Sequence, residues 1–151
     1  PPPAAPTPAP PPPPPPAAAD PSEAEIRADL LRTISEPIYF EYNEDAIRAD
    51  AQPILARKAA ILLANPALRI RIAGHADERG TDEYNLVLGT RRATSAKRFL
   101  ESRGIDGSRI EVVSFGEERP VDTSGTEAGY AKNRRDEFEA IAGTDRLVRP
   151  Q

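Results

Sequence analysis

The stretch Gly74–Ala93, GHADERGTDEYNLVLGTRRA, runs from an apolar segment through a charged turn into a long periodic segment. Before it, alternating apolar residues predict a strand over 67–75 with one buried face: Leu68, Ile70 and Ile72. After it, a helix is expected over 83–103, ended by Gly104. The turn holds the chain's only histidine, an arginine and four carboxylates. So many charges between two ordered elements favour a catalytic, metal or ligand site.

Arg92 is the anomaly of the expected helix. Three apolar residues lie four before, four after and seven after it, and therefore share its face: Leu88, Ala96 and Phe99. Asn85 belongs to the same broad face, whereas Arg91 is turned to the side. A guanidinium in an apolar stripe must reach an edge or find an anion, because an unpaired buried charge is very costly.

Asp77 is the natural partner of Arg92, since it follows the strand that ends at His75 and lies in the turn that feeds the helix. One carboxylate and one guanidinium that converge on a pocket suit a zwitterion, with the ammonium on Asp77 and the carboxylate held bidentately by Arg92. The alternative is an internal Asp77–Arg92 salt bridge without a ligand. Spacing alone leaves both open.

The remaining elements follow from periodicity and from Pro, Gly and Asn punctuation. We expect a helix over 20–34, a strand over 37–42, a helix capped by Asp50 and ended at 65–66, a strand over 110–114, a loop or short helix over 125–135, and a strand over 136–142. The charges of the last strand suit a sheet edge. Alternating strands and helices, β-α-β-α-β-(α)-β, predict a two-layer α/β sandwich.

Composition divides the 151 residues into four parts. Residues 1–19 contain only Pro, Ala and one Thr, which favours polyproline II: an unstructured tail, a semi-rigid tether or, with less support, a Pro-rich ligand. A helical lead-in over 20–36, one domain over 37–142 and a flexible tail over 143–151 follow. A net charge of −4 gives no basic footprint for nucleic acid. No apolar run approaches the ~20 residues of a membrane span.

Rival chemistries have weaker support. Carboxylates in the turn could act as an acid/base pair, but Asp82 and Glu83 also suit a helix N-terminus, and no nucleophile–base arrangement is present, so we expect no enzyme. One histidine and no cysteine make a metal site poor; His75 is expected to be a hydrogen-bonded structural residue. The glycines match no phosphate-binding fingerprint, and no cofactor is expected.

The stretch Gly74–Ala93 resembles the OmpA-like peptidoglycan-binding domains. The motif N-x2-L-[SG]-x2-RA is met by Asn85, Leu88, Gly89, Arg92 and Ala93. Together with FGEERP and YAKNRR, the form ADERGT places the likeness closest to the peptidoglycan-associated lipoproteins, over about residues 37–141. The resemblance implies a mixed sheet.

It also implies non-covalent binding of peptidoglycan through the meso-diaminopimelate of its stem peptide, a residue that ends in an ammonium beside a carboxylate. The family's key acid and arginine fall on Asp77 and Arg92. Further site residues are expected at Asn43, where relatives often carry Asp, and at Asn85, Arg79, Thr81 and Arg134.

The family resemblance sets expectations for the cellular context as well. We expect the periplasmic face of the outer membrane, TolB of the Tol system as a partner, and a lipid anchor in the full-length protein, although this chain holds no cysteine to carry one. An outer-membrane porin domain or a stator protein with the same ligand is the alternative.

Overall fold

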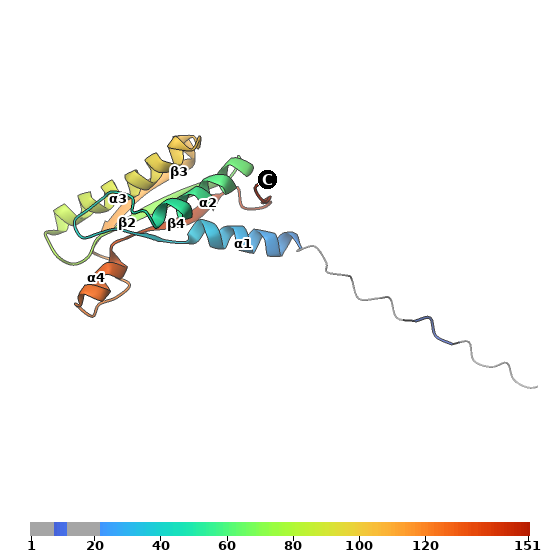
Figure 1. Ribbon diagram of the computed structural model, residues 1–151, viewed down its shortest axis with the longest axis horizontal. Coiled ribbons are helices and arrows are strands. Elements are labelled where there is room, and N and C mark those ends of the chain that lie inside the picture. Colours follow the sequence, from blue (N-terminus) through green and yellow to red (C-terminus); the bar gives the residue numbers. More distant parts are fainter. Residues whose placement is uncertain (1–7, 12–21) are drawn as a thin grey trace, which may run out of the picture.

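The computed structural model describes residues 8–11 and 22–151, so most of the predicted tether lies outside the described residues. The described chain alternates helices and strands (Figure 1). The elements are α1 (Glu23–Ser35), β1 (Ile38–Tyr39), α2 (Ala51–Ala64), β2 (Arg69–His75), α3 (Asp82–Ser102), a 3-10 turn (Gly107–Arg109), β3 (Ile110–Gly116), α4 (Glu127–Asn133) and β4 (Arg135–Ala142). None of the helices in this part is long and apolar enough to cross a membrane.

The strands form one mixed sheet in the order β1-β4-β2-β3, with β2 and β3 parallel and the other pairs antiparallel. This confirms the predicted two-layer α/β sandwich. The prediction that the last strand lies at an edge is wrong, because β4 pairs with β1 on one side and β2 on the other. Its charges are tolerated there because Glu137 and Glu139 face the exposed side of the sheet, while Phe138 faces the core.

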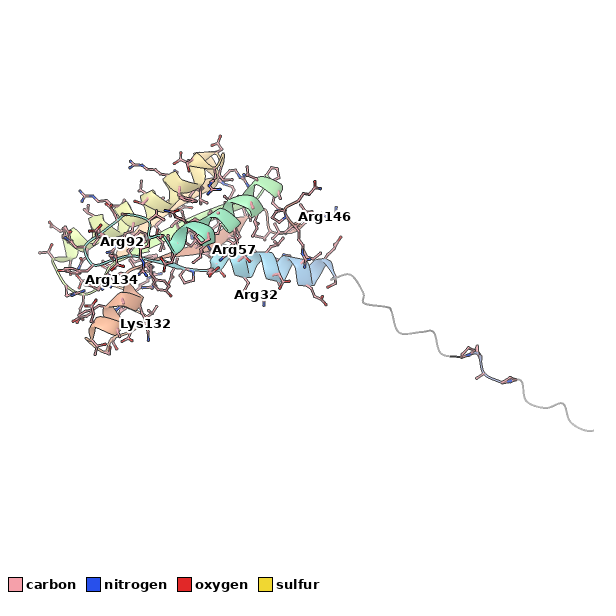
Figure 2. The ribbon with its side chains drawn as sticks, viewed as in Figure 1. Arg32, Arg57, Arg92, Lys132, Arg134 and Arg146 are labelled. Atoms are coloured by element: carbon pink, nitrogen blue, oxygen red, sulfur yellow. The ribbon has the colours of Figure 1, made fainter. Side chains whose placement is uncertain are left out.

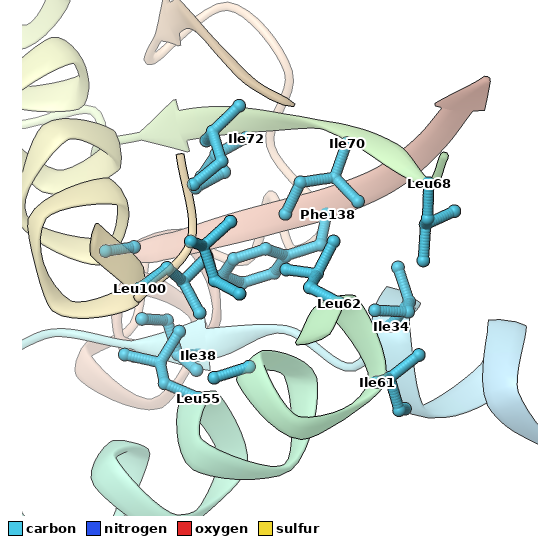
Figure 3. Close-up of a cluster of buried hydrophobic side chains, with 14 of the residues drawn as sticks. Ile34, Ile38, Leu55, Ile61, Leu62, Leu68, Ile70, Ile72, Leu100 and Phe138 are labelled. Carbon is cyan, nitrogen blue, oxygen red and sulfur yellow. The ribbon is translucent and has the colours of Figure 1, made fainter. Parts of the chain in front are cut away.

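Helices α1, α2 and α3 cover one face of the sheet and share one apolar core (Figure 3). Ile70 and Ile72 of β2 and Phe138 of β4 contribute the sheet side of this core. The other face is a charged surface on which Arg71 lies 3.3 Å from Glu111. Over the first half of β2, Ile70 and Ile72 are buried while Arg69 is exposed and Arg71 half-buried, which explains why the alternation was visible in the sequence.

Two glycines let α3 lie unusually close to β2. A Cβ on Gly74 would fall 1.7 Å from the carbonyl oxygen of Gly89, and one on Gly89 would fall 2.2 Å from Ser114 Oγ. Neither position tolerates a side chain without separation of helix and strand. The close approach brings the middle of α3 to the carboxyl end of β2, where the charged turn begins.

The helix starts differ from one another. Thr81 caps α3 by accepting a hydrogen bond from the Tyr84 N–H at 3.1 Å. Asp50 precedes α2 but makes no cap hydrogen bond, and its carboxylate pairs with Arg48 at 3.0 Å instead. Asp50 thus occupies the predicted N-cap position but does not cap the helix with its side chain, because its carboxylate pairs with the guanidinium of Arg48.

Both ends of the domain are anchored to α2. Lys58, fully buried, donates from its ammonium to the carbonyls of Thr33, Ile34 and Glu36 at 2.6–2.9 Å, and so closes the end of α1. Asn65 exchanges two hydrogen bonds with the backbone of Val148, at 2.8 and 2.9 Å.

The C-terminal segment, predicted to be a flexible tail over 143–151, contacts the rest of the domain. Leu147 is buried in the core, and Arg27 donates to the carbonyl of Thr144. One apolar side chain and the amide of Asn65, the residue that follows α2, thus give this segment partners within the domain up to Val148.

Candidate functional site

Arg92 projects from α3 into the interior and is 0% exposed, while its neighbour Arg91 is exposed, as the helical spacing predicted. Its guanidinium donates to three backbone carbonyls: Nε to Glu44 at 2.8 Å, Nη1 to His75 at 2.9 Å and Nη2 to Glu41 at 3.1 Å. Burial lowers its pKa to about 10, so it remains a cation at neutral pH. Each terminal nitrogen keeps one further N–H for another acceptor.

Asp77 lies just past the end of β2 and is 4% exposed. Its carboxylate pairs with Arg79 at 2.8 Å and with Arg134 at 3.5 Å. Burial acts to raise the pKa of Asp77, but the hydrogen bonds from Arg79 and the charges of Arg79 and Arg134 outweigh it and lower the pKa below its ordinary value. The carboxylate is therefore ionised at neutral pH.

No Asp77–Arg92 salt bridge is found within the described part of the chain, which argues against the alternative of a closed internal pair. Asp77 and Arg92 instead line one small cavity of about 50 Å³. Its walls come from the loop after β1, the turn after β2 and the first turns of α3: Tyr42, Asn43, Ala76, Asp77, Arg79, Gly80, Tyr84, Asn85, Leu88 and Arg92. A carboxylate and a guanidinium with unused donors thus face one space.

Two asparagines shape this cavity. Asn43 sits at a positive φ of 59°, a conformation that Asn adopts more readily than most residues, and its side chain accepts from the Tyr84 hydroxyl. Asn85 is 1% exposed and donates to the Asp77 carbonyl at 3.2 Å and to Glu117 at 3.1 Å. Asn85 therefore fixes the turn that carries Asp77.

Two further residues predicted for the site, Arg134 and Thr81, lie near the cavity but do not line it. Arg134, between α4 and β4, is behind Asp77 and donates to the Phe40 carbonyl at 2.9 Å. Figure 2 shows it at the same end of the molecule as Arg92, far from Arg146. Thr81 is an exposed helix cap and does not line the cavity.

Within the described residues, two buried titratable groups near the site have no hydrogen-bond partner: the ring of His75, whose Nε2 lies 3.7 Å from a Glu137 carboxylate oxygen, and the carboxyl group of Asp136. The expected hydrogen bonding of the His75 ring is thus wrong, whereas its backbone carbonyl accepts a hydrogen bond from Arg92. Burial raises the pKa of Asp136 well above its ordinary value, against the charge of Arg92. The protonated form is favoured, and no hydrogen bond joins Asp136 to the free donors of Arg92.

Sequence reasoning missed the aromatic rim of the cavity. Tyr42 lies within the strand predicted over 37–42, but β1 ends at Tyr39 and Tyr42 is 55% exposed. Tyr84 was passed over as a helix residue. Tyr130 of α4 also reaches this end, where its hydroxyl donates to Glu78 at 2.8 Å. No residue pattern within a single element signals that these tyrosines lie at the same end of the domain.

Comparison with known proteins agrees with this architecture. The model of the OmpA family matches residues 39–134, which run from the last residue of β1 to the residue after α4 and include every candidate site residue. The chain belongs to the OmpA family.

Within this family, the chain is similar to several peptidoglycan-associated lipoproteins. A peptidoglycan-associated lipoprotein of Brucella melitensis is 44% identical over 107 residues, covering 71% of this chain and 64% of that protein. One of Mesorhizobium japonicum is 45% identical, with 78% and 68% covered. The crystal structure of the peptidoglycan-associated lipoprotein from Burkholderia pseudomallei superposes with a TM-score of 0.68 at 37% identity, over 70% of this chain and 89% of that one. The chain thus spans less than two thirds of the Brucella relative.

Proposed function

We propose that this chain binds peptidoglycan non-covalently and that it grips the meso-diaminopimelate of the stem peptide in the cavity between Asp77 and Arg92. The observation that carries the proposal is the pairing of an ionised carboxylate and a guanidinium with free N–H groups on one cavity. The names of the relatives support the same ligand class.

The two ends of the amino acid centre have separate partners in this proposal. The ligand carboxylate takes the remaining N–H of each terminal nitrogen of Arg92, a fork that matches a carboxylate bidentately. The ligand ammonium takes Asp77. Asn85 and Asn43 hold the turn and the loop from which these contacts are made.

The cavity of about 50 Å³ has room for only a few water molecules, so the loops at its mouth must open for a stem peptide. Binding at one such polar site is expected to be modest, and many copies along a polymer supply avidity. We propose a binding module rather than an enzyme, since the lining residues include no Ser, Cys or His to act as a nucleophile–base pair.

The cellular role follows from the same ligand. We propose that the parent protein tethers the outer membrane to the cell wall from its periplasmic side, through a lipid anchor, as part of a Tol system in which TolB is a partner. The relatives' shared name, which joins "peptidoglycan-associated" to "lipoprotein", supports this setting.

The test is a pull-down on purified sacculi with and without free meso-diaminopimelate. We expect the wild-type chain to sediment with the sacculi and to be released by the free amino acid. Asp77→Asn should sediment less, and diaminopimelate with amidated carboxylates should release the wild type poorly. Sedimentation that free diaminopimelate leaves unchanged, or equal retention of Asp77→Asn, would refute the proposed site.

A further inference from the structure

Asp77 has two cationic partners of different character. Arg134 is buried and tied to the Phe40 carbonyl at 2.9 Å, so its charge is a fixed part of the wall. Arg79 lies two residues from Asp77 in the turn, and one third of its side chain is exposed. Of the two, only Arg79 lines the cavity.

Arg79 occupies the carboxylate of Asp77 from the cavity side. Its Nη2 donates to Oδ2 at 2.8 Å and its Nε to Oδ1 at 3.2 Å, a bidentate contact. The backbone N–H of Arg79 adds a third bond to Oδ1 at 3.0 Å. An ammonium that bound Asp77 in the cavity would therefore need carboxylate oxygens that this guanidinium already occupies.

The same guanidinium is also held at the rim by groups other than Asp77. It stacks over Tyr42, 4.0 Å from the ring centroid, and over Tyr130, at 4.5 Å, and its Nη1 lies 3.4 Å from Glu127. These contacts come from the loop after β1 and from α4, on opposite sides of the turn. They give Arg79 a place to remain when its contact with Asp77 is broken.

We infer that Arg79 is a built-in competitor of the ligand: its guanidinium takes the place on Asp77 that the ligand ammonium requires, and binding exchanges one cation for the other. This inference rests on the proposed function. The exchange leaves the number of charges around Asp77 unchanged, and Arg79 keeps Glu127 and the two rings. A ligand without an ammonium cannot replace the guanidinium, so the exchange selects for a free amino group.

A protein whose competent form is only partly populated binds with an affinity reduced by that fraction. Removal of Arg79 should therefore tighten binding, whereas a residue that contacts the ligand would weaken it when removed. Because the Arg79–Asp77 contact is partly exposed, its removal should increase the affinity for the ligand by about fivefold.

The experiment titrates meso-diaminopimelate calorimetrically into the wild type, Arg79→Ala and Arg79→Gln. Arg91→Ala is the matched control, because it removes one exposed positive charge from the next element without touching the cavity. We expect both Arg79 variants to bind about fivefold more tightly and the control to match the wild type. Equal or weaker binding by both Arg79 variants would overturn the inference and leave the proposed function standing. Absence of binding in all four proteins would overturn both.

A second measurement reads the exchange directly in the wild type. The Nε–H resonance of Arg79 should shift on addition of meso-diaminopimelate, because its bond to Asp77 is broken. The Nε–H of Arg134, which is bonded to the Phe40 carbonyl, should move much less. A ligand that binds without shifting the Arg79 signal would refute the displacement.

Discussion

Replacement of Arg92 by Lys tests whether this side chain serves the fold and the ligand together. The three carbonyls of Glu41, Glu44 and His75 are contacted by three different nitrogens of Arg92. Lysine keeps the charge but has a single nitrogen on a different stem, so it cannot reach all three. Two of the three bonds should be lost.

The expected cost follows from these bonds. A hydrogen bond to a charged group contributes about 1.5–3 kcal/mol, and two of the three are only partly buried, so water can replace some of the loss. We expect Arg92→Lys to lower the free energy of unfolding by about 3 kcal/mol and the melting temperature by roughly 10 °C. Binding of meso-diaminopimelate should weaken at least about tenfold, since no planar fork remains for its carboxylate.

Urea denaturation and calorimetric titration measure the two effects separately. Arg91→Lys is the control, because its exposed side chain should change stability by no more than about 0.5 kcal/mol. An Arg92→Lys variant within about 1 kcal/mol of the wild type would refute the structural half of the argument. A destabilised variant that bound the ligand as tightly as the wild type would refute the ligand half.

Three further changes probe the frame of the site. Gly74→Ala puts a Cβ 1.7 Å from the Gly89 carbonyl oxygen, and we expect a loss of at least about 3 kcal/mol in urea denaturation; near-wild-type stability would contradict the close packing. Lys58→Met leaves three carbonyls at the end of α1 without their donor and should cost about 3 kcal/mol; a loss below about 1 kcal/mol would count against this anchor. Burial and the charge of Arg135 lower the pKa of His75 from 6.5 to about 4. As the pH falls from 6.5 to about 4, only the unfolded chain takes up the proton. The free energy of unfolding of the wild type should therefore fall by up to about 3 kcal/mol relative to that of His75→Phe, and parallel plots of unfolding free energy against pH would disprove this.

The sequence predicted what is encoded within one element. The stripe around Arg92 placed its side chain inside, because helical spacing alone decides which residues share a face. The alternation in β2 and the acids of the turn could likewise be recognised, because each is a pattern within one short stretch of sequence. Asp77 and Arg92 were correctly expected to line one space, since both are positioned by the unit from β2 to α3.

What the sequence did not predict depends on contacts between distant segments. Arg134 was expected at the site, but its partner was not named: it pairs with Asp77, which lies 57 residues earlier in the chain. The central place of β4 depends on strand order, which the pattern within a strand does not contain. The docking of residues near Val148 depends on one amide at Asn65. Each outcome is set by which elements meet, so local periodicity gave no signal for it.

The wall of the cavity is held by arginines rather than by the sheet. Strand β1 ends at Tyr39, and the loop that follows it contributes Tyr42 and Asn43 to the cavity. Three carbonyls of this loop, those of Phe40, Glu41 and Glu44, are instead bonded by the side chains of Arg134 and Arg92. Because each of these side chains also faces Asp77 or the cavity, the charges that hold the loop set the electrostatics of the site. A loop bound by a few side-chain bonds can open at lower cost than a strand in a ladder, and the proposed binding of a stem peptide in so small a cavity would require such opening.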